Sequence, residues 1–291
     1  MENLRGSILM VVAMAGFSRA DMVVKSLSTR LAVGEVLALL GAGGAVLFSA
    51  LALWRRDRLF SGDLFSRPVI VRNLGELVGT LAFVSAIAFT PLAQASAILQ
   101  ATPLAVTLGA ALFLGEKVGW RRWSAIVIGF IGVMIVIRPG TEGFSVLSLL
   151  AVVAVIGLAV RDVATRRVPK TIASMQLATY GFATIIPAGL LMTALAPAGF
   201  VPPSPLDPAQ IAGALLFGTG GYYALIAAMR LGEVSVITPF RYTRLIFALI
   251  IGWAVFSESV DRYTLIGGAV IVGSGLYTLW RQARLRGQLR R

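Results

Sequence analysis

One short pattern of residues occurs twice in this chain, and the distance between its copies predicts a doubled architecture. A glycine is followed five residues later by an aspartate and four residues after that by a cation, first at Gly16, Asp21 and Lys25 and again at Gly157, Asp162 and Arg166. The copies lie 141 residues apart in a chain of 291. The glutamates that end two apolar runs, Glu116 and Glu258, lie 142 residues apart. We therefore expect two repeats, residues 1–140 and 141–291, of which the second ends in a basic tail.

The composition places both repeats in a membrane. Hydrophobic residues make up 57% of the chain, charged residues make up 13%, and the mean hydropathy is +0.86. A soluble domain of this composition would expose large apolar patches. The net charge of +13 does not indicate nucleic-acid binding, because the basic residues occur in short runs between apolar stretches.

The chain has no cysteine and no histidine, and these absences exclude several chemistries at once. They remove the commonest zinc ligands, a thiol nucleophile, a Ser-His-Asp triad and an imidazole proton relay. We therefore expect no enzyme activity, no metal and no cofactor.

Long apolar segments predict ten membrane-spanning helices, five in each repeat. A crossing needs about 17 to 25 mostly apolar residues. The predicted spans cover residues 6–27, 32–54, 68–89, 92–114, 121–138, 145–165, 171–195, 209–230, 233–256 and 263–280. The first segment is too long for the apolar core of a signal peptide and lacks a clear cleavage site. The expected fold is all-α.

The distribution of Lys and Arg predicts the orientation of the spans. With the N-terminus inside, 19 of the 26 basic residues fall on the cytoplasmic side, as cationic loops require. The opposite side receives four, which are Lys25, Arg30, Arg138 and Arg262. Because each repeat has an odd number of spans, the second repeat must cross the membrane in the opposite sense. Both termini are then cytoplasmic.

Several motifs resemble those of the EamA family of drug/metabolite transporters. In the first half they are Gln-Ala-Thr-Pro-Leu at 100–104, Leu-Gly-Glu-Lys-Val-Gly-Trp-Arg-Arg-Trp at 114–123 and Arg-Pro-Gly at 138–140. In the second half they are Thr-Pro-Phe-Arg-Tyr-Thr at 238–243, Phe-Ser-Glu at 256–258 and Leu-Ile-Gly-Gly at 265–268. The resemblance implies two inverted repeats around a central cavity, lined mainly by the first, third, fourth, sixth, eighth and ninth spans. It also implies substrates like those of YddG-like amino-acid exporters and of carriers for S-adenosylmethionine or riboflavin.

Two arginines near the middle of the ninth span are the strongest candidates for a substrate site. Arg241 and Arg244 are three residues apart and are predicted to share a helix face. A charge within a bilayer is costly unless it faces a polar cavity or a partner. We expect Glu76 on the third span to pair either with Arg241 or, locally, with Arg72. Arg244 would then be free to bind a substrate carboxylate through two parallel hydrogen bonds.

Uncharged and aromatic side chains complete the predicted site. The hydrogen-bonding candidates are Ser96, Gln100 and Thr102 on the fourth span and Thr238 on the ninth, and the aromatic candidates are Phe17, Phe83, Tyr222, Tyr223 and Tyr242. For the three residues of the fourth span, packing between helices is an equally weighted interpretation. The acid–cation pairs of the repeated pattern are interpreted as i,i+4 pairs within one helix, and the two repeated glutamates as helix-end braces.

These inferences combine into one expected function. We expect an inner-membrane carrier that exports amino acids or similar amphipathic metabolites by alternating access. A carrier that takes up riboflavin, S-adenosylmethionine or a similar metabolite is the alternative in the same class, and a lipid-modifying membrane enzyme is the alternative in another. The expected partners are a small-molecule substrate and the lipid bilayer, without nucleic acid, and the chain is expected to be a monomer or a dimer.

Overall fold

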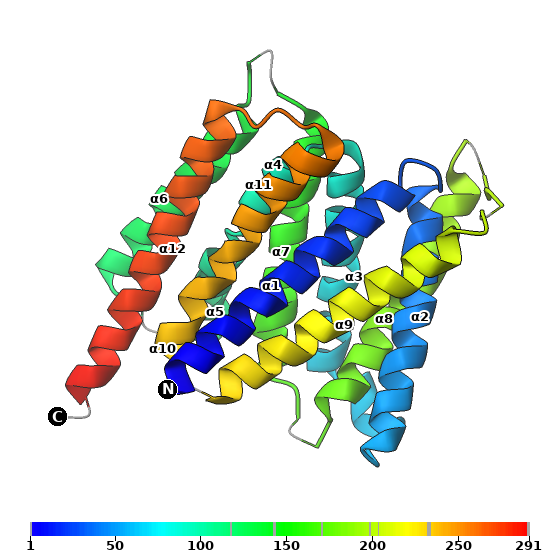
Figure 1. Cartoon of the computed structure of the whole chain (residues 1–291). Coiled ribbons are helices and arrows are strands. Elements are labelled where there is room, and N and C mark those ends of the chain that lie inside the picture. The colour runs from blue at the N-terminus through cyan, green and yellow to red at the C-terminus, as the bar shows by residue number, and fades with distance from the viewer. Residues whose placement is uncertain are drawn as a thin grey trace.

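The computed structural model describes residues 2–116, 118–141, 144–169, 171–197, 199–202, 204–231 and 234–289. Over these residues the chain is a bundle of helices without strands, drawn in Figure 1. The first half contains α1 (Glu2–Leu27), α2 (Val33–Trp54), η1 (Gly62–Phe65), α3 (Arg67–Phe89), α4 (Leu92–Leu99), α5 (Thr102–Phe113) and α6 (Trp120–Ile137). The second half contains η2 (Val146–Ser148), α7 (Leu149–Thr165), α8 (Ser174–Leu195), α9 (Asp207–Leu231), α10 (Val234–Ile237), η3 (Thr238–Tyr242), α11 (Thr243–Phe256) and α12 (Arg262–Leu289).

All ten predicted spans are helical, and the all-α membrane fold is confirmed. Nine helical segments among the described residues are long and apolar enough to cross a membrane, and the remaining predicted span is the 25-residue helix α9. Large apolar side chains also point outward along the bundle, for example Val46, Ile128, Leu191 and Trp253. A lipid environment satisfies such an exposed apolar surface, which water would not.

Two spans are broken near their middle. The fourth span divides into α4 and α5 at Gln100 and Ala101, and the ninth divides into α10, η3 and α11. Each break lies beside a Thr-Pro pair, Thr102-Pro103 and Thr238-Pro239. Proline removes a backbone donor and clashes with the preceding turn, so it ends or kinks a helix. The freed backbone groups are tolerated in a membrane where they face protein or a cavity.

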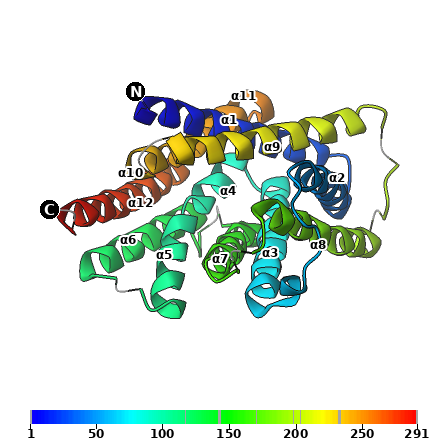
Figure 2. The ribbon, with the colours of Figure 1, turned by 90° about the horizontal axis from the view of Figure 1, so that it is seen from below.

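The helix contacts show the two-repeat symmetry. The main pairs are α1 with α9, α3 with α7, α2 with α8 and α6 with α12, and α4 also contacts α11. Exchanging each span with its equivalent in the other half turns the α1–α9 pair into the α7–α3 pair and returns α2–α8 and α6–α12 to themselves. Figure 2 shows α1 beside α9 on one face, with α3 and α7 side by side across the bundle. The repeats are therefore interleaved rather than adjacent.

The repeated glycines are crossing points of these pairs. A Cβ on Gly16 would lie 2.9 Å from the carbonyl oxygen of Phe217 and 3.2 Å from the Cα of Gly221, and a Cβ on Gly157 would lie 2.5 Å from the backbone nitrogen of Gly79. Close backbone approach of this kind requires small residues. Gly273 is not a crossing point, because no atom of the described residues lies within 4 Å of a Cβ there. The Gly218–Gly221 cluster lies within one continuous helix, α9.

The repeated charges pair between repeats rather than within one helix. Lys25 Nζ lies 2.8 Å from Glu258 Oε1, and Arg166 bonds to Glu116. Each cation therefore reaches the glutamate of the other repeat, and the predicted i,i+4 pairs of Asp21 with Lys25 and of Asp162 with Arg166 are wrong. The interleaved helices explain this, because they bring the end of the first helix of one repeat beside the last loop of the other. The bracing role predicted for both glutamates fits these contacts.

These two ion pairs mark the opposite ends of the bundle. We call the ends the Glu258 end and the Glu116 end. Figure 1 shows the first residues and the end of α12 at one end, which is the Glu116 end, and the α6–α7 and α11–α12 connections at the other. The cations Lys117 and Lys170, which were predicted to be cytoplasmic, lie outside the described residues, as do Arg290 and Arg291 of the basic tail. The described side chains likewise exclude those of Arg230, Arg284 and Arg286.

Candidate substrate site

The two broken spans meet in the middle of the bundle. Gln100 follows the last residue of α4. Its side-chain Nε2 donates a hydrogen bond to the backbone carbonyl oxygen of Arg241 in η3, at 3.4 Å. This contact satisfies a carbonyl in the interrupted stretch. Around it lie α1, α3, α7 and α11, which the helix contacts connect to these breaks. The predicted residues of the fourth and ninth spans are therefore brought together.

Arg244 is not free, because it is held by an aspartate of the repeated pattern. Its Nη2 lies 2.8 Å and its Nε 3.2 Å from Oδ2 of Asp21 on α1. The guanidinium also stands over the rings of Phe17 and Phe83, 5.5 Å from each centroid. This neutralised, ring-flanked pair is mostly buried. The prediction that Arg244 is available for a carboxylate is wrong in this conformation.

Glu76 belongs to a second charged cluster between α3 and α7. Arg72 Nη2 lies 2.9 Å from Glu76 Oε2, and Arg161 Nη1 lies 3.2 Å from Glu76 Oε1. Arg161 Nε also lies 2.9 Å from Oδ1 of Asp162. The local Arg72–Glu76 pair is thus confirmed and the pairing of Glu76 with Arg241 is wrong. Arg161, which we counted among the cytoplasmic cations, instead reaches into the bundle where the glycine crossing brings α7 against α3.

Arg241 is the unpaired member of this central group. Among the residues that the structure describes, its guanidinium has no hydrogen-bond or ion-pair partner, and the residue is exposed. The charges that act on it most strongly are those of Asp162 and Arg161. The central group contains one more positive than negative charge, because its arginines are Arg72, Arg161, Arg241 and Arg244 and its carboxylates are Asp21, Glu76 and Asp162. An anion near Arg241 would neutralise this excess.

The uncharged candidates divide into bonded and unbonded groups. The Thr102 hydroxyl donates to the carbonyl of Leu99 at 2.6 Å and so satisfies a backbone acceptor at the break between α4 and α5. In contrast, the hydroxyl oxygens of Ser96, Thr238 and Tyr242 are buried without a hydrogen-bond partner in the described part of the chain. Buried hydroxyls normally find a partner. Three such groups on the two broken spans are therefore available to a ligand or to another conformation.

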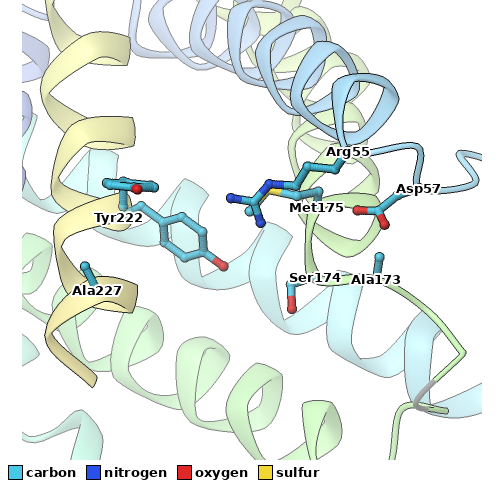
Figure 3. A pocket seen from close by; sticks show the side chains of 8 residues that line it. Arg55, Asp57, Ala173, Ser174, Met175, Tyr222 and Ala227 are labelled. Carbon is cyan, nitrogen blue, oxygen red and sulfur yellow. The ribbon is translucent and has the colours of Figure 1, made fainter. Parts of the chain in front are cut away.

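The remaining two candidates line a cavity at the Glu116 end. Tyr222 and Tyr223 on α9 face the end of α2 and the start of α8 across a cavity of about 660 Å³, which Figure 3 shows from close by. The other lining residues are Arg55, Asp57, Ala173, Ser174, Met175 and Ala227. In Figure 3 the Arg55 guanidinium extends toward Tyr222. The Tyr222 ring packs edge-on against Phe48, with 5.9 Å between centroids, and its phenol interacts electrostatically with Arg72 and Arg161. The cavity lies at this end, and Tyr222 is the lining residue whose phenol interacts with the central charges.

Sequence reasoning missed two members of the site. Asp21 was assigned to its neighbour Lys25, although the excess of midspan arginines is a signal that each acid is needed elsewhere. Arg161 was counted among the cytoplasmic cations, although it lies within the predicted span 145–165 and Gly75, Gly79 and Gly157 predict a tight crossing that draws its helix inward. The first error concerns the partner of a residue, and the second concerns its position.

Comparisons with known proteins agree with the fold and with its two repeats. The sequence model described as the EamA-like transporter family matches residues 4–138 and again 146–280. A riboflavin transporter of Rhizobium johnstonii is 29% identical over 96% of this chain and 92% of that protein. An S-adenosylmethionine uptake transporter of Rickettsia conorii is 25% identical over 94% and 92%, and the pseudopaline exporter CntI of Pseudomonas aeruginosa is 27% identical over 92% and 93%. A solved crystal structure aligns with a TM-score of 0.61 and 20% identity over 96% of this chain and 98% of its own.

Proposed function

Because the chain belongs to the EamA-like transporter family, we propose that it carries a small metabolite with a carboxylate group, and that amino acids are the substrates to test first. The substrate binds between the two repeats and crosses by alternating access, in which the central site opens first to one end and then to the other. The transport class rests on the family. The substrate class rests on the charges of the site.

The observation that carries this proposal is the guanidinium of Arg241, which has no hydrogen-bond or ion-pair partner among the described residues. Every other central charge has an opposite charge within 3.2 Å. A planar guanidinium binds a carboxylate through two parallel hydrogen bonds. The buried hydroxyls of Thr238 and Tyr242 lie in the same five-residue helix, η3, and offer further hydrogen bonds. The rings of Phe17 and Phe83 supply an apolar wall beside Arg244.

The location and direction of transport are parts of the same proposal. The distribution of Lys and Arg supports an inner-membrane protein with the Glu116 end, and so both termini, in the cytoplasm. The cavity beside Tyr222 lies at that end, so substrate would reach the central site from the cytoplasm. Alternating access passes through a cytoplasm-open state in either direction of transport, and we propose export as the direction.

A flux measurement in proteoliposomes tests the substrate class. Purified protein is reconstituted with a panel of radiolabelled amino acids, and Arg241→Gln is compared with the wild type. We expect saturable amino-acid flux and at least a tenfold lower kcat/KM in the variant, because one lost charge-assisted pair contributes about 1.5–3 kcal/mol. Arg241→Lys keeps the charge and should lie between them. An absence of flux for every amino acid would reject this substrate class.

Uptake of an aromatic cofactor is the second candidate. It is favoured by the relatives that are named as riboflavin and S-adenosylmethionine transporters, and by the aromatic pair of Tyr222 and Phe48 at the cavity. The same vesicles loaded with riboflavin or S-adenosylmethionine test it. A change in the lipid products of these vesicles would instead support the enzyme alternative.

A further inference from the structure

The ion pairs between repeats lie outside the proposed substrate site, and each copy of the repeated pattern contributes the cation of one of them. Lys25 with Glu258 and Arg166 with Glu116 are equivalent contacts at opposite ends of the bundle. We infer that these two pairs are the alternating gates of the carrier. This inference rests on the proposed transport by alternating access.

The two gates differ in their surroundings. The side chains of Lys25 and Glu258 are each 12% exposed, whereas those of Arg166 and Glu116 are 48% and 47% exposed. An exposed pair is weak because water and salt screen it, while breaking a buried pair is costly. In this conformation the Glu258 gate is buried and closed, whereas the Glu116 gate is exposed although its ion pair is also formed.

The Glu258 gate is also reinforced by neighbouring contacts. Oε2 of Glu258 accepts the backbone N–H of Leu92 at 2.8 Å, which joins the start of the broken fourth span to the gate. Lys25 donates to the carbonyls of Ile87 and Thr90 at 2.9 and 2.7 Å. Three helices, α1, α3 and α4, are thereby tied to the loop that contains Glu258.

Two further ion pairs join separate elements at the same end. Arg30 Nη2 lies 2.6 Å from Asp207 at the start of α9, and Arg138 Nη2 lies 2.9 Å from Asp261 before α12. Together with Lys25, these are three of the four cations that the orientation prediction places on the non-cytoplasmic side. Their pairing adds contacts between separate elements at this end, whereas the described cavity lies at the other end.

The interleaved repeats predict the second conformation. If the repeats exchange their conformations, the Arg166–Glu116 pair becomes the buried gate and the Lys25–Glu258 pair becomes hydrated. A variant that weakens one pair must shift the population toward the state in which that pair is exposed. The shift has opposite directions for the two gates, which a purely structural brace would not produce.

Distance measurements in lipid nanodiscs test this inference without a substrate. The chain contains no cysteine, so spin labels can be attached to introduced cysteines alone. One pair of labels at Thr29 and Ser259 spans the Glu258 end, and a second pair at Gly119 and Thr165 spans the Glu116 end. Glu258→Gln is the main variant, because its amide oxygen still accepts the Leu92 N–H while its charge is lost.

In Glu258→Gln we expect a second, longer component in the Thr29–Ser259 distance distribution and a second, shorter component in the Gly119–Thr165 distribution. The matched variant Glu116→Gln should leave the Thr29–Ser259 distance at its short value. Unchanged distances in folded Glu258→Gln protein would overturn the inference. If that variant does not fold, Lys25→Gln breaks the same pair from the other side, and failure of both to fold would show a structural brace and overturn the inference as well. A shift in distances without amino-acid flux would reject only the proposed substrate class.

Discussion

At the scale of single residues, Arg241 and Arg244 show that the partner of an arginine determines its contribution to stability. They are three positions apart, yet Arg244 is bound to Asp21 and Arg241 has no partner in the described chain. Arg244→Gln leaves the Asp21 carboxylate buried and unpaired, so we expect the free energy of unfolding to fall by about 3 kcal/mol. Arg241→Gln removes an uncompensated charge and should leave stability unchanged or raise it. Thermal unfolding of both variants in the same detergent measures the difference, and equal losses would contradict the assignment.

Asp261 gives a second prediction, outside the membrane spans. It accepts the backbone N–H groups of Tyr263 and Thr264 at 2.8 and 3.0 Å and so caps the start of α12. Partial burial raises the pKa of Asp261, but the hydrogen bonds from Thr264 and the charge of Arg138 outweigh it, and the net pKa is lowered. A lowered folded-state pKa stabilises the protein above the unfolded pKa, and this contribution is lost as the pH falls through the folded value.

The cap and the charge of Asp261 can be separated by substitution. Asp261→Ala removes both and should cost about 1 kcal/mol, whereas Asp261→Asn keeps a capping oxygen and should cost less. Unfolding curves at pH 7 and at a pH below the ordinary pKa of an aspartate test both points. The difference between wild type and Asp261→Asn should shrink at the lower pH, and a constant difference would show that the charge of Asp261 does not contribute.

At the scale of helices, the sequence predicts each span but not its breaks. Span length and apolar content are local properties, so all ten segments could be found from the printed residues. The interruption at η3 depends on Pro239 together with the packing of neighbouring helices, and only the position of the proline is visible in the sequence. For the same reason the candidate residues and the local Arg72–Glu76 pair were predicted, whereas the second partner of Glu76, Arg161, and the partner of Asp21, Arg244, were not. Partner choice depends on which helices cross, and that is a long-range property.

The glycine crossings provide the test at this scale. In Gly157→Ala the new Cβ would lie 2.5 Å from the backbone of Gly79, and a backbone atom cannot move aside as a side chain can. We expect a loss of about 1–3 kcal/mol in unfolding free energy. Gly273→Ala is the matched control, because nothing lies within 4 Å and alanine favours a helix by about 1 kcal/mol. Thermal unfolding should move in opposite directions, and a stable Gly157→Ala would contradict the crossing.

At the scale of the whole molecule, the inverted repeats require equivalent loops to lie on opposite sides of the membrane. Gly119 follows the Glu116 gate and Val260 follows the Glu258 gate, and the structure places these loops at opposite ends. Introduced cysteines at these two positions can be labelled with a membrane-impermeant maleimide in intact cells and in inside-out vesicles. The charge distribution predicts that position 260 reacts in intact cells and position 119 in inside-out vesicles. Reaction in the reverse compartments would invert the proposed direction of the cavity, and reaction of both positions in one compartment would contradict the inverted repeats themselves.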